Sequence, residues 1–143
     1  MKFLLYGANG YTGELIARAA RDQGLRPVLA GRTEEKVEPI ARSLGFDYRI
    51  FDLSDSQALD QALREVPLVL HAAGPFIHTA RPMLEACLRT QTHYLDITGE
   101  IDVFELAHGL DRQARQTGIM ILPGTGFDVV PTDCLALFLK KQL

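Results

Sequence analysis

The sequence is poor in cysteine, lacks a long apolar run and has no broad basic region. Cys87 and Cys134 stand apart in apolar helical contexts without CxxC spacing, so we expect reduced thiols in a cytoplasmic protein and no metal site. No segment approaches the length of a bilayer span, and the apolar residues at the start are too few for a signal peptide. Lysine and arginine are scattered among acidic residues at a net charge of -3, so nucleic acid is not an expected partner.

The chain also lacks internal repeats, low-complexity tracts and any linker rich in proline, glycine and serine. Its 143 residues are close to the usual size of one domain. Hydrophobic residues make up 47% and charged residues 23%, which is the ordinary balance of a globular protein rather than a disordered one. We therefore expect one packed core.

Apolar runs of strand length alternate with longer stretches of helical periodicity, a pattern typical of βαβ units and a parallel sheet. We expect strands at Lys2–Tyr6, Pro27–Ala30, Asp47–Phe51, Leu68–His71, His93–Asp96 and Ile119–Leu122. We expect helices at Gly13–Asp22, Glu34–Leu44, Asp55–Arg64, Ala80–Thr90 and Ile101–Thr117. The strands are apolar nearly throughout, as is usual where helices cover both faces of a sheet.

Several helix ends carry capping signals. Ser54 and Gln57 have the spacing of a capping box, and Thr33 and Thr79 are candidate N-caps. Glycines that favour a left-handed cap follow three of the expected helices, at Gly24, Gly45 and Gly118. These signals agree with the helices expected from periodicity.

Six strands joined by five crossover helices predict an α/β fold with a doubly wound parallel sheet, the Rossmann fold. Right-handed crossovers would order the strands 3-2-1-4-5-6. This domain accounts for residues 1–123, and residues 124–143 form a connection and a C-terminal helix. The helix is apolar at 134–139 and lacks a cover, so we expect that it leads toward an absent second domain and that a homodimer could form through Leu137 and Phe138.

A glycine-rich loop follows the first expected strand and opens the first expected helix. It has the pattern GxxGxxG and consists of Gly7, Ala8, Asn9, Gly10, Tyr11, Thr12 and Gly13. Glycines at these positions let the backbone turn tightly and approach a pyrophosphate, while N–H groups at the helix start point toward the anion. The loop therefore predicts a dinucleotide site, and the alternative is a tight turn that holds no ligand.

The end of the second expected strand indicates which dinucleotide is bound. A site that prefers NAD places an acidic residue there to accept from the ribose hydroxyls, whereas this chain has Arg32. A guanidinium binds a phosphate through charge-assisted hydrogen bonds, so Arg32 favours NADP over NAD. Thr33 and Lys36 could add a hydroxyl and a second positive charge. The alternative is that Arg32 is a solvated surface residue.

Two further strand ends supply candidate cofactor contacts. Asp52 follows the third strand and could accept from the adenine amine, or it could simply begin a turn. The small residues Ala73 and Gly74 after the fourth strand allow close approach of the cofactor, and Pro75 stiffens their loop. His71 lies on an apolar strand, where a core histidine is the more common interpretation.

Five segments together resemble the saccharopine dehydrogenase-like oxidoreductases, which include trans-acting enoyl reductases. They are YGANGYTGE, AGR, AAGPF, HYLDITGE and PGTGFDVVPTD, in the order and at the intervals of that family. The resemblance implies an NADP(H)-binding domain followed by an α/β domain that forms the substrate pocket and the dimer interface. It also implies hydride transfer to or from a small organic substrate with a carbonyl, an imine or an activated alkene. By that resemblance this chain is an N-terminal part, which we expect to be inactive alone.

The carboxyl ends of the last strands hold the candidate catalytic residues. Asp96 and Glu100 follow the fifth strand and Asp128 follows the sixth, at the sheet edge where ligands bind in parallel folds. Any of these carboxylates could relay a proton, although Asp96 and Glu100 could equally cap the next helix.

Two other functions are considered. A short-chain dehydrogenase is disfavoured because no tyrosine is followed four residues later by lysine. A regulatory or structural module that binds NADP(H) without chemistry remains the alternative to an oxidoreductase.

Overall fold

The computed structural model describes residues 2–127 and 129–142. Its centre is a six-stranded parallel sheet in the order β3-β2-β1-β4-β5-β6, as expected from the sequence. The strands are β1 (Leu4–Tyr6), β2 (Val28–Gly31), β3 (Tyr48–Ile50), β4 (Leu68–His71), β5 (His93–Asp96) and β6 (Ile121–Leu122). The order reverses between β1 and β4, and this switch point is where a doubly wound sheet binds its ligand.

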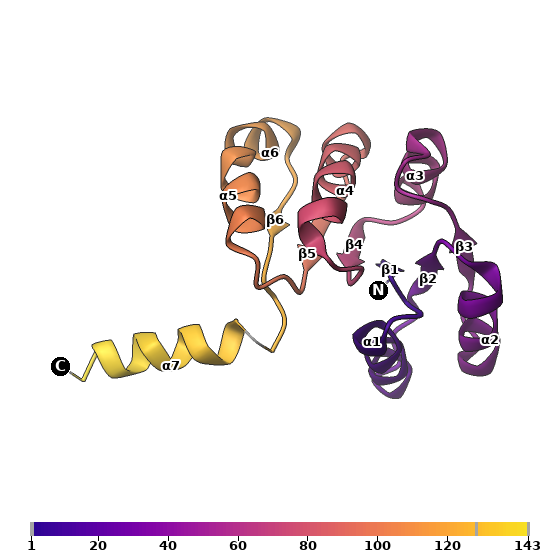
Figure 1. Ribbon diagram of the computed structural model, residues 1–143, viewed down its shortest axis with the longest axis horizontal. Helices are drawn as coiled ribbons and strands as arrows, with labels where there is room; N and C mark the ends of the chain where they lie inside the picture. The colour runs from indigo at the N-terminus through magenta and orange to yellow at the C-terminus, as the bar shows by residue number, and fades with distance from the viewer. Residues whose placement is uncertain (1, 128, 143) are drawn as a thin grey trace.

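Helices pack on both faces of the sheet, in the arrangement that right-handed crossovers require (Figure 1). They are α1 (Tyr11–Asp22), α2 (Glu34–Leu44), α3 (Ser56–Arg64), α4 (Phe76–Thr90), α5 (Ile101–Gly109), α6 (Asp111–Thr117) and α7 (Val130–Lys140). In Figure 1, α1 and α2 lie on one face and α3 to α6 lie on the other, while α7 extends away from the body. The body is thus a Rossmann fold with one projecting helix.

Two helices differ from the sequence prediction by more than two residues or in number. The helix expected at Ile101–Thr117 is divided into α5 and α6, since Gly109 and Leu110 end the first helix before Asp111 begins the second. Helix α4 starts at Phe76 rather than Ala80, so the first turn belongs to the helix. The candidate N-cap Thr79 therefore lies inside α4, and that prediction was wrong.

The cap predictions have mixed outcomes. Asp55, rather than Ser54, caps α3, because its carboxylate accepts from the Ala58 N–H at 3.0 Å. Thr33 occupies the N-cap position of α2 but makes no side-chain cap hydrogen bond. Gly45 and Gly118 take the left-handed conformation directly after α2 and α6, as expected.

One row of leucines crosses the α1 and α2 face of the sheet from strand to strand. Registered neighbours form the row Leu29, Leu5, Leu70, Leu95 and Leu122. The first two side chains are completely buried, whereas Leu122 is 46% exposed at the β6 edge. Helices α1 and α2 therefore cover the first part of this face and leave its β6 end exposed.

Among the residues that the structure describes, no helix combines the length and the apolar character needed to cross a bilayer.

Candidate functional site

The glycine-rich loop connects β1 to α1 through close backbone contacts. Gly7 has a φ of +86°, and a Cβ there would lie 2.8 Å from the backbone nitrogen of Ala73. A Cβ on Gly13 would lie 2.1 Å from the carbonyl oxygen of Gly7. Both distances are far below van der Waals contact, so the loop can form only with glycine at these two positions. The N–H of Gly10 donates to the Gly7 carbonyl at 3.0 Å and tightens the turn.

The N-terminus of α1 opens directly from this turn. Gly10 is its N-cap and supplies no side-chain acceptor. Within the described part of the chain, the N–H groups of Tyr11, Thr12 and Gly13 have no hydrogen-bond acceptor. Unpaired N–H groups at the start of a twelve-residue helix form an anion site, since the helix dipole adds to their positive charge.

A cleft of about 260 Å³ lies beside this loop. It is lined by Tyr6, Gly7, Asn9, Gly10, Gly31, Arg32, Thr33, Lys36, Ala72, Ala73 and Gly74. Gly31 and Arg32 stand at the carboxyl end of β2, where the backbone of Gly31 leaves room for the Asn9 side chain. The cleft therefore brings the expected cations and the glycine loop together.

Arg32 is exposed, and no described residue forms a hydrogen bond or ion pair with its guanidinium. Its positive charge nevertheless acts on both neighbouring ionisable groups, Tyr6 and Asp52. Burial, followed by the charge of Asp52, raises the pKa of Tyr6 to about 12, and Arg32 opposes this rise. The guanidinium thus lies at the cleft with its donors uncommitted, as binding of a phosphate requires.

A second cleft of about 480 Å³ shares Tyr6, Arg32, Ala73 and Gly74 with the first. Its other lining residues are Asp52, Leu53, Ser54, Pro75, His78, Thr79 and Pro82. The Ser54 N–H and hydroxyl both donate to the Asp52 carboxylate, and these bonds hold the pKa of Asp52 below its ordinary value. Asp52 therefore lies where we expected it but also holds the turn after β3, so both interpretations of this residue describe the geometry.

The loop between β4 and α4 lines both clefts. Thr79 donates its hydroxyl hydrogen to the Ala73 carbonyl at 2.7 Å, and the same oxygen lies 3.0 Å from Nε2 of His71. Because the only hydroxyl hydrogen is used, His71 must donate through Nε2. Its Nδ1 is buried without a partner among the described residues, and burial lowers the pKa of His71 to about 3. His71 is thus a neutral core residue that contacts the loop through the hydroxyl of Thr79.

Asp96 lies at the end of β5 and is completely buried. Its carboxylate accepts from the Tyr94 hydroxyl at 2.6 Å, the Thr98 N–H at 3.0 Å and the Gly124 N–H at 2.8 Å. Burial and the adjacent Asp96 charge raise the pKa of Tyr94 well above its ordinary value. These contacts join the loop after β5 to the loop after β6.

Glu100 lies at the N-cap position of α5, where its backbone carbonyl accepts from the Val103 N–H, but its side chain makes no cap bond to that helix. Its carboxylate instead accepts from the N–H groups of Phe76 and Ile77, at the start of α4. The interpretation that the side chains of Asp96 and Glu100 cap α5 was therefore wrong. Glu100 binds the start of α4, and Asp96 binds the loops after β5 and β6. The third candidate, Asp128, lies outside the described residues.

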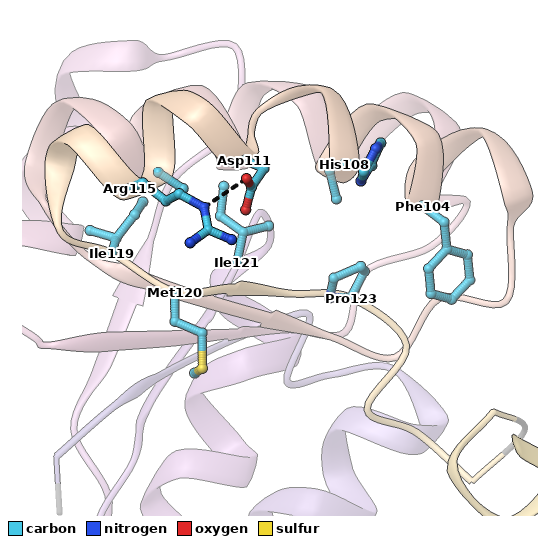
Figure 2. Close-up of a pocket in the computed structure, with 10 residues that line it drawn as sticks. Phe104, His108, Asp111, Arg115, Ile119, Met120, Ile121 and Pro123 are labelled. Atoms are coloured by element: carbon cyan, nitrogen blue, oxygen red, sulfur yellow. Dashed lines mark hydrogen bonds and ion pairs between the residues drawn. The ribbon is translucent and has the colours of Figure 1, made fainter. Parts of the chain in front are cut away.

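A separate cleft of about 480 Å³ runs along β6, beneath α5 and α6 (Figure 2). Its lining includes Phe104, His108, Ile121 and Pro123, together with an ion pair between Asp111 and Arg115 at 2.8 Å. It shares no residue with the two clefts at the switch point. This cleft is a surface depression beside the edge strand and brings none of the expected site residues together.

Sequence reasoning missed several lining residues. Tyr6, His78 and Pro82 were not among the expected contacts, although all three face the shared clefts. His78 and Pro82 belong to the first turns of α4, which the sequence prediction began too late. The Gly74-Pro75 pair could have located the start of that helix, since proline is common at a helix entrance.

Comparison with known proteins identifies relatives of this chain. A family model described as the saccharopine dehydrogenase NADP binding domain matches residues 3–122. The saccharopine dehydrogenase-like oxidoreductase of Mus musculus is 30% identical over 160 residues, which cover 98% of this chain and 37% of the relative. The trans-acting enoyl reductase of Mycobacterium leprae (strain TN) is 34% identical over 141 residues, which cover 91% and 33%. The chain thus spans about a third of the length of these relatives.

A solved structure has the same fold. Apo saccharopine dehydrogenase (L-Glu forming) from Saccharomyces cerevisiae superposes with a TM-score of 0.77 at 20% sequence identity. The superposition covers 89% of this chain and 27% of that enzyme. At this identity the comparison establishes the Rossmann-like architecture alone.

Proposed function

The chain belongs to the saccharopine dehydrogenase NADP-binding domain family, and from this premise we propose which residues hold NADP(H) and what the bound cofactor does. The pyrophosphate lies against the N-terminus of α1 and the loop Gly7 to Gly13. Arg32, Thr33 and Lys36 bind the 2′-phosphate, and Asp52 lies near the adenine. Ala73, Gly74 and Pro75 contact the other half of the cofactor.

One observation carries this assignment. Arg32 lies in the same cleft as the glycine loop, with its guanidinium bound to no described residue. The backbone leaves no room for a side chain at Gly7 or Gly13. The first N–H groups of α1, directly after this loop, have no acceptor among the described residues. A phosphate monoester fits this set of one guanidinium, one ammonium and one hydroxyl.

The reaction that we propose is reduction or oxidation of a small organic substrate that has a carbonyl, an imine or an activated alkene. Bound NADP(H) supplies the hydride chemistry, and the chain orients it and excludes water on one side. The assignment of Asp96, Glu100 and Asp128 to proton transfer stays a prediction. The contacts of Asp96 and Glu100 support a role in holding loops, since each carboxylate accepts hydrogen bonds from its own chain.

The cofactor assignment is tested by calorimetric titration of the chain with NADP(H) and NAD(H) at one salt concentration. We expect Arg32→Asp to weaken NADP(H) binding about 100-fold, since it replaces an attraction with a repulsion, and to change NAD(H) binding less than about threefold. Arg26→Asp is the matched control, because it makes the same charge change beside a different cleft, next to Lys2 and Asp47. Equal losses for both cofactors would remove Arg32 from phosphate recognition.

We also propose that residues 124–143 connect the Rossmann domain, residues 1–123, to a substrate and dimerisation domain. Two apolar surfaces support this. All the large hydrophobic side chains of α7 are exposed, and the leucine row of the sheet ends uncovered at Leu122. We expect charged substitutions at Leu137 or Phe138 to reduce any homodimer measured by light scattering, and an unchanged mass would contradict this.

The proposed location is the cytoplasm. Cys87 and Cys134 are both free thiols, which is the usual state in a reducing compartment. Cell fractionation of a tagged chain tests the location directly.

A further inference from the structure

The Glu100 carboxylate joins two segments that are far apart in the sequence. One oxygen accepts from the Phe76 N–H at 2.7 Å and the other accepts from the Ile77 N–H at 2.6 Å. These are the first two residues of α4, a helix of 15 residues. Each carboxyl oxygen thus accepts one N–H hydrogen bond from the first turn of this helix. The Glu100 side chain therefore caps the N-terminus of α4 through two hydrogen bonds.

The segment that Glu100 holds leads directly out of the cofactor clefts. Ala73, Gly74 and Pro75 line the clefts and immediately precede Phe76. The other side of this loop is fixed by Thr79, whose hydroxyl donates to the Ala73 carbonyl and lies 3.2 Å from the Pro75 carbonyl. Within the described chain, the N–H groups of Ala73 and Gly74 have no acceptor. The contacts of this loop thus leave two N–H groups at the clefts uncommitted.

Glu100 is itself held by a rigid support. Its backbone N–H donates to the Thr98 hydroxyl at 3.0 Å, and the Thr98 N–H donates to the buried Asp96 carboxylate. Thr98 and Asp96 are both completely buried. The backbone at Glu100 is therefore tied to the end of β5 through two consecutive hydrogen bonds, and the side chain is held by its own bonds to Phe76 and Ile77.

We propose that Glu100 is a positioning residue that fixes the loop from Ala73 to Ile77 and thereby sets the affinity for the dinucleotide without touching it. The inference rests on the proposed cofactor assignment. Loss of the carboxylate frees the first turn of α4, so the Ala73 and Gly74 N–H groups must be ordered when the cofactor binds. The cost of that ordering lowers affinity.

Two measurements on Glu100→Gln test this inference. The amide at position 100 can accept from one N–H but places its own N–H₂ against the other, so one of the two bonds is lost. We expect the Phe76 and Ile77 amides to exchange with solvent at least about tenfold faster, and the NADP(H) dissociation constant to rise about tenfold. Glu100→Asp keeps the charge near the helix and is expected to lose less affinity than Glu100→Gln.

Glu105→Gln is the control, since Glu105 is an exposed residue of α5 and the substitution makes the same chemical change. Faster amide exchange with unchanged NADP(H) affinity would overturn the positioning role, as would unchanged exchange at Phe76 and Ile77. Failure of the unaltered chain to bind NADP(H) would instead overturn the proposed function. Slow amide exchange in β1 and β4 verifies that each variant is folded. If Glu100→Gln does not fold, the same two measurements are made on Glu100→Asp.

Discussion

The two halves of the sheet's carboxyl edge are built in opposite ways. Around β1 and β2 the backbone approaches itself so closely that Gly7 and Gly13 admit no side chain, and the first N–H groups of α1 and Arg32 have no partners among the residues that the structure describes. Around β5 the carboxylates of Asp96 and Glu100 are fully engaged by N–H groups of the chain itself. The first half is therefore organised to accept an anion, whereas the second half supplies its own anions and holds its loops in place.

The largest effect is expected from Gly13→Ala in the first half. The new Cβ would lie 2.1 Å from the Gly7 carbonyl oxygen, so the backbone of the loop must move. We expect a loss of about 3 kcal/mol in the free energy of unfolding and a rise of about 100-fold in the NADP(H) dissociation constant. Chemical denaturation and calorimetry measure the two changes.

Gly109→Ala is the control for that substitution. Apart from its chain neighbours and the backbone of its own helix, no heavy atom of the described residues lies within 4 Å of a Cβ at Gly109, at the end of α5. We expect a stability change within about 1 kcal/mol and unchanged cofactor binding. Wild-type affinity in Gly13→Ala would show that close approach of the loop is not what forms the anion site.

In the second half, we expect Asp96→Asn to lower stability by about 2 kcal/mol. The asparagine oxygen can still accept from Thr98 and Gly124, but its N–H₂ faces the buried Tyr94 hydroxyl, which then lacks an acceptor for its hydrogen. Tyr94→Phe removes that hydroxyl, so the double variant should be more stable than Asp96→Asn alone. Additive losses in a double-mutant cycle would contradict the assigned hydrogen bond.

Sequence patterns predicted the framework well because the signals there are local. Strands β4 and β5 and helix α2 have the bounds expected from apolar runs and periodicity, and the glycine loop lies between β1 and α1 as its spacing indicated. Arg32 was located by its position at the end of the second strand, which apolar runs predicted. These features depend on residues that are close in the sequence.

The contacts of the second half could not be predicted in this way. Glu100 binds residues 24 and 23 positions earlier, and Asp96 binds Gly124 across 28 positions. An acidic residue before a helix predicts a cap for that helix, which here is α5. The Glu100 carboxylate instead binds the start of α4. Only the packing of α4 beside α5 decides which helix start receives Glu100.

His71 is on β4, between the two halves, and its effect on stability is expected to be the next largest after that of Asp96→Asn. Its ring is surrounded by Tyr6, Phe76 and Tyr94, and burial lowers its pKa to about 3. The unfolded chain binds a proton at His71 below about pH 6.5 while the folded chain does not, so stability falls as the pH is lowered through that value toward 3. We expect a slope of up to about 1.4 kcal/mol per pH unit from this residue.

Denaturation curves of His71→Gln and the unaltered chain between pH 7 and pH 5 measure this slope. The carboxylates of Asp52, Asp60 and Glu65 also have lowered pKa values, but their contribution is lost at more acidic pH. The variant should therefore be less sensitive to pH across this interval. Parallel pH profiles would show that His71 is protonated in the folded protein as readily as in the unfolded chain.

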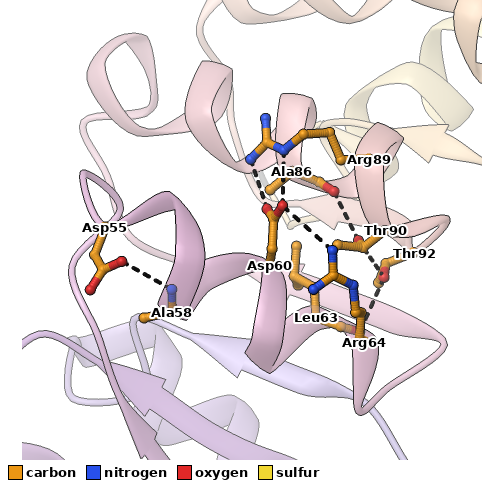
Figure 3. A network of polar contacts seen from close by, with 9 residues as sticks. All are labelled: Asp55, Ala58, Asp60, Leu63, Arg64, Ala86, Arg89, Thr90 and Thr92. Atoms are coloured by element: carbon orange, nitrogen blue, oxygen red, sulfur yellow. Dashed lines mark hydrogen bonds and ion pairs between the residues drawn. The ribbon is translucent and has the colours of Figure 1, made fainter.

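The smallest effect is expected where Asp60 of α3 binds Arg89 of α4 (Figure 3). The bidentate bonds of 3.0 and 2.7 Å, with Arg64 4.0 Å away, hold the pKa of Asp60 below its ordinary value. We expect Asp60→Asn to cost about 1 kcal/mol of stability near neutral pH and to cost less as the pH falls through the lowered pKa.

The Asp60 pair distinguishes support of the fold from support of the loop. It fixes α4 near its C-terminal end, whereas Glu100 fixes the first turn of the same helix. If the affinity for NADP(H) depends on the first turn alone, Asp60→Asn will lower stability and leave the dissociation constant unchanged. Asp111→Asn, in an exposed pair within α6, should change neither quantity. A weaker affinity in Asp60→Asn would mean that the whole helix, and not its first turn, positions the loop beside the cofactor.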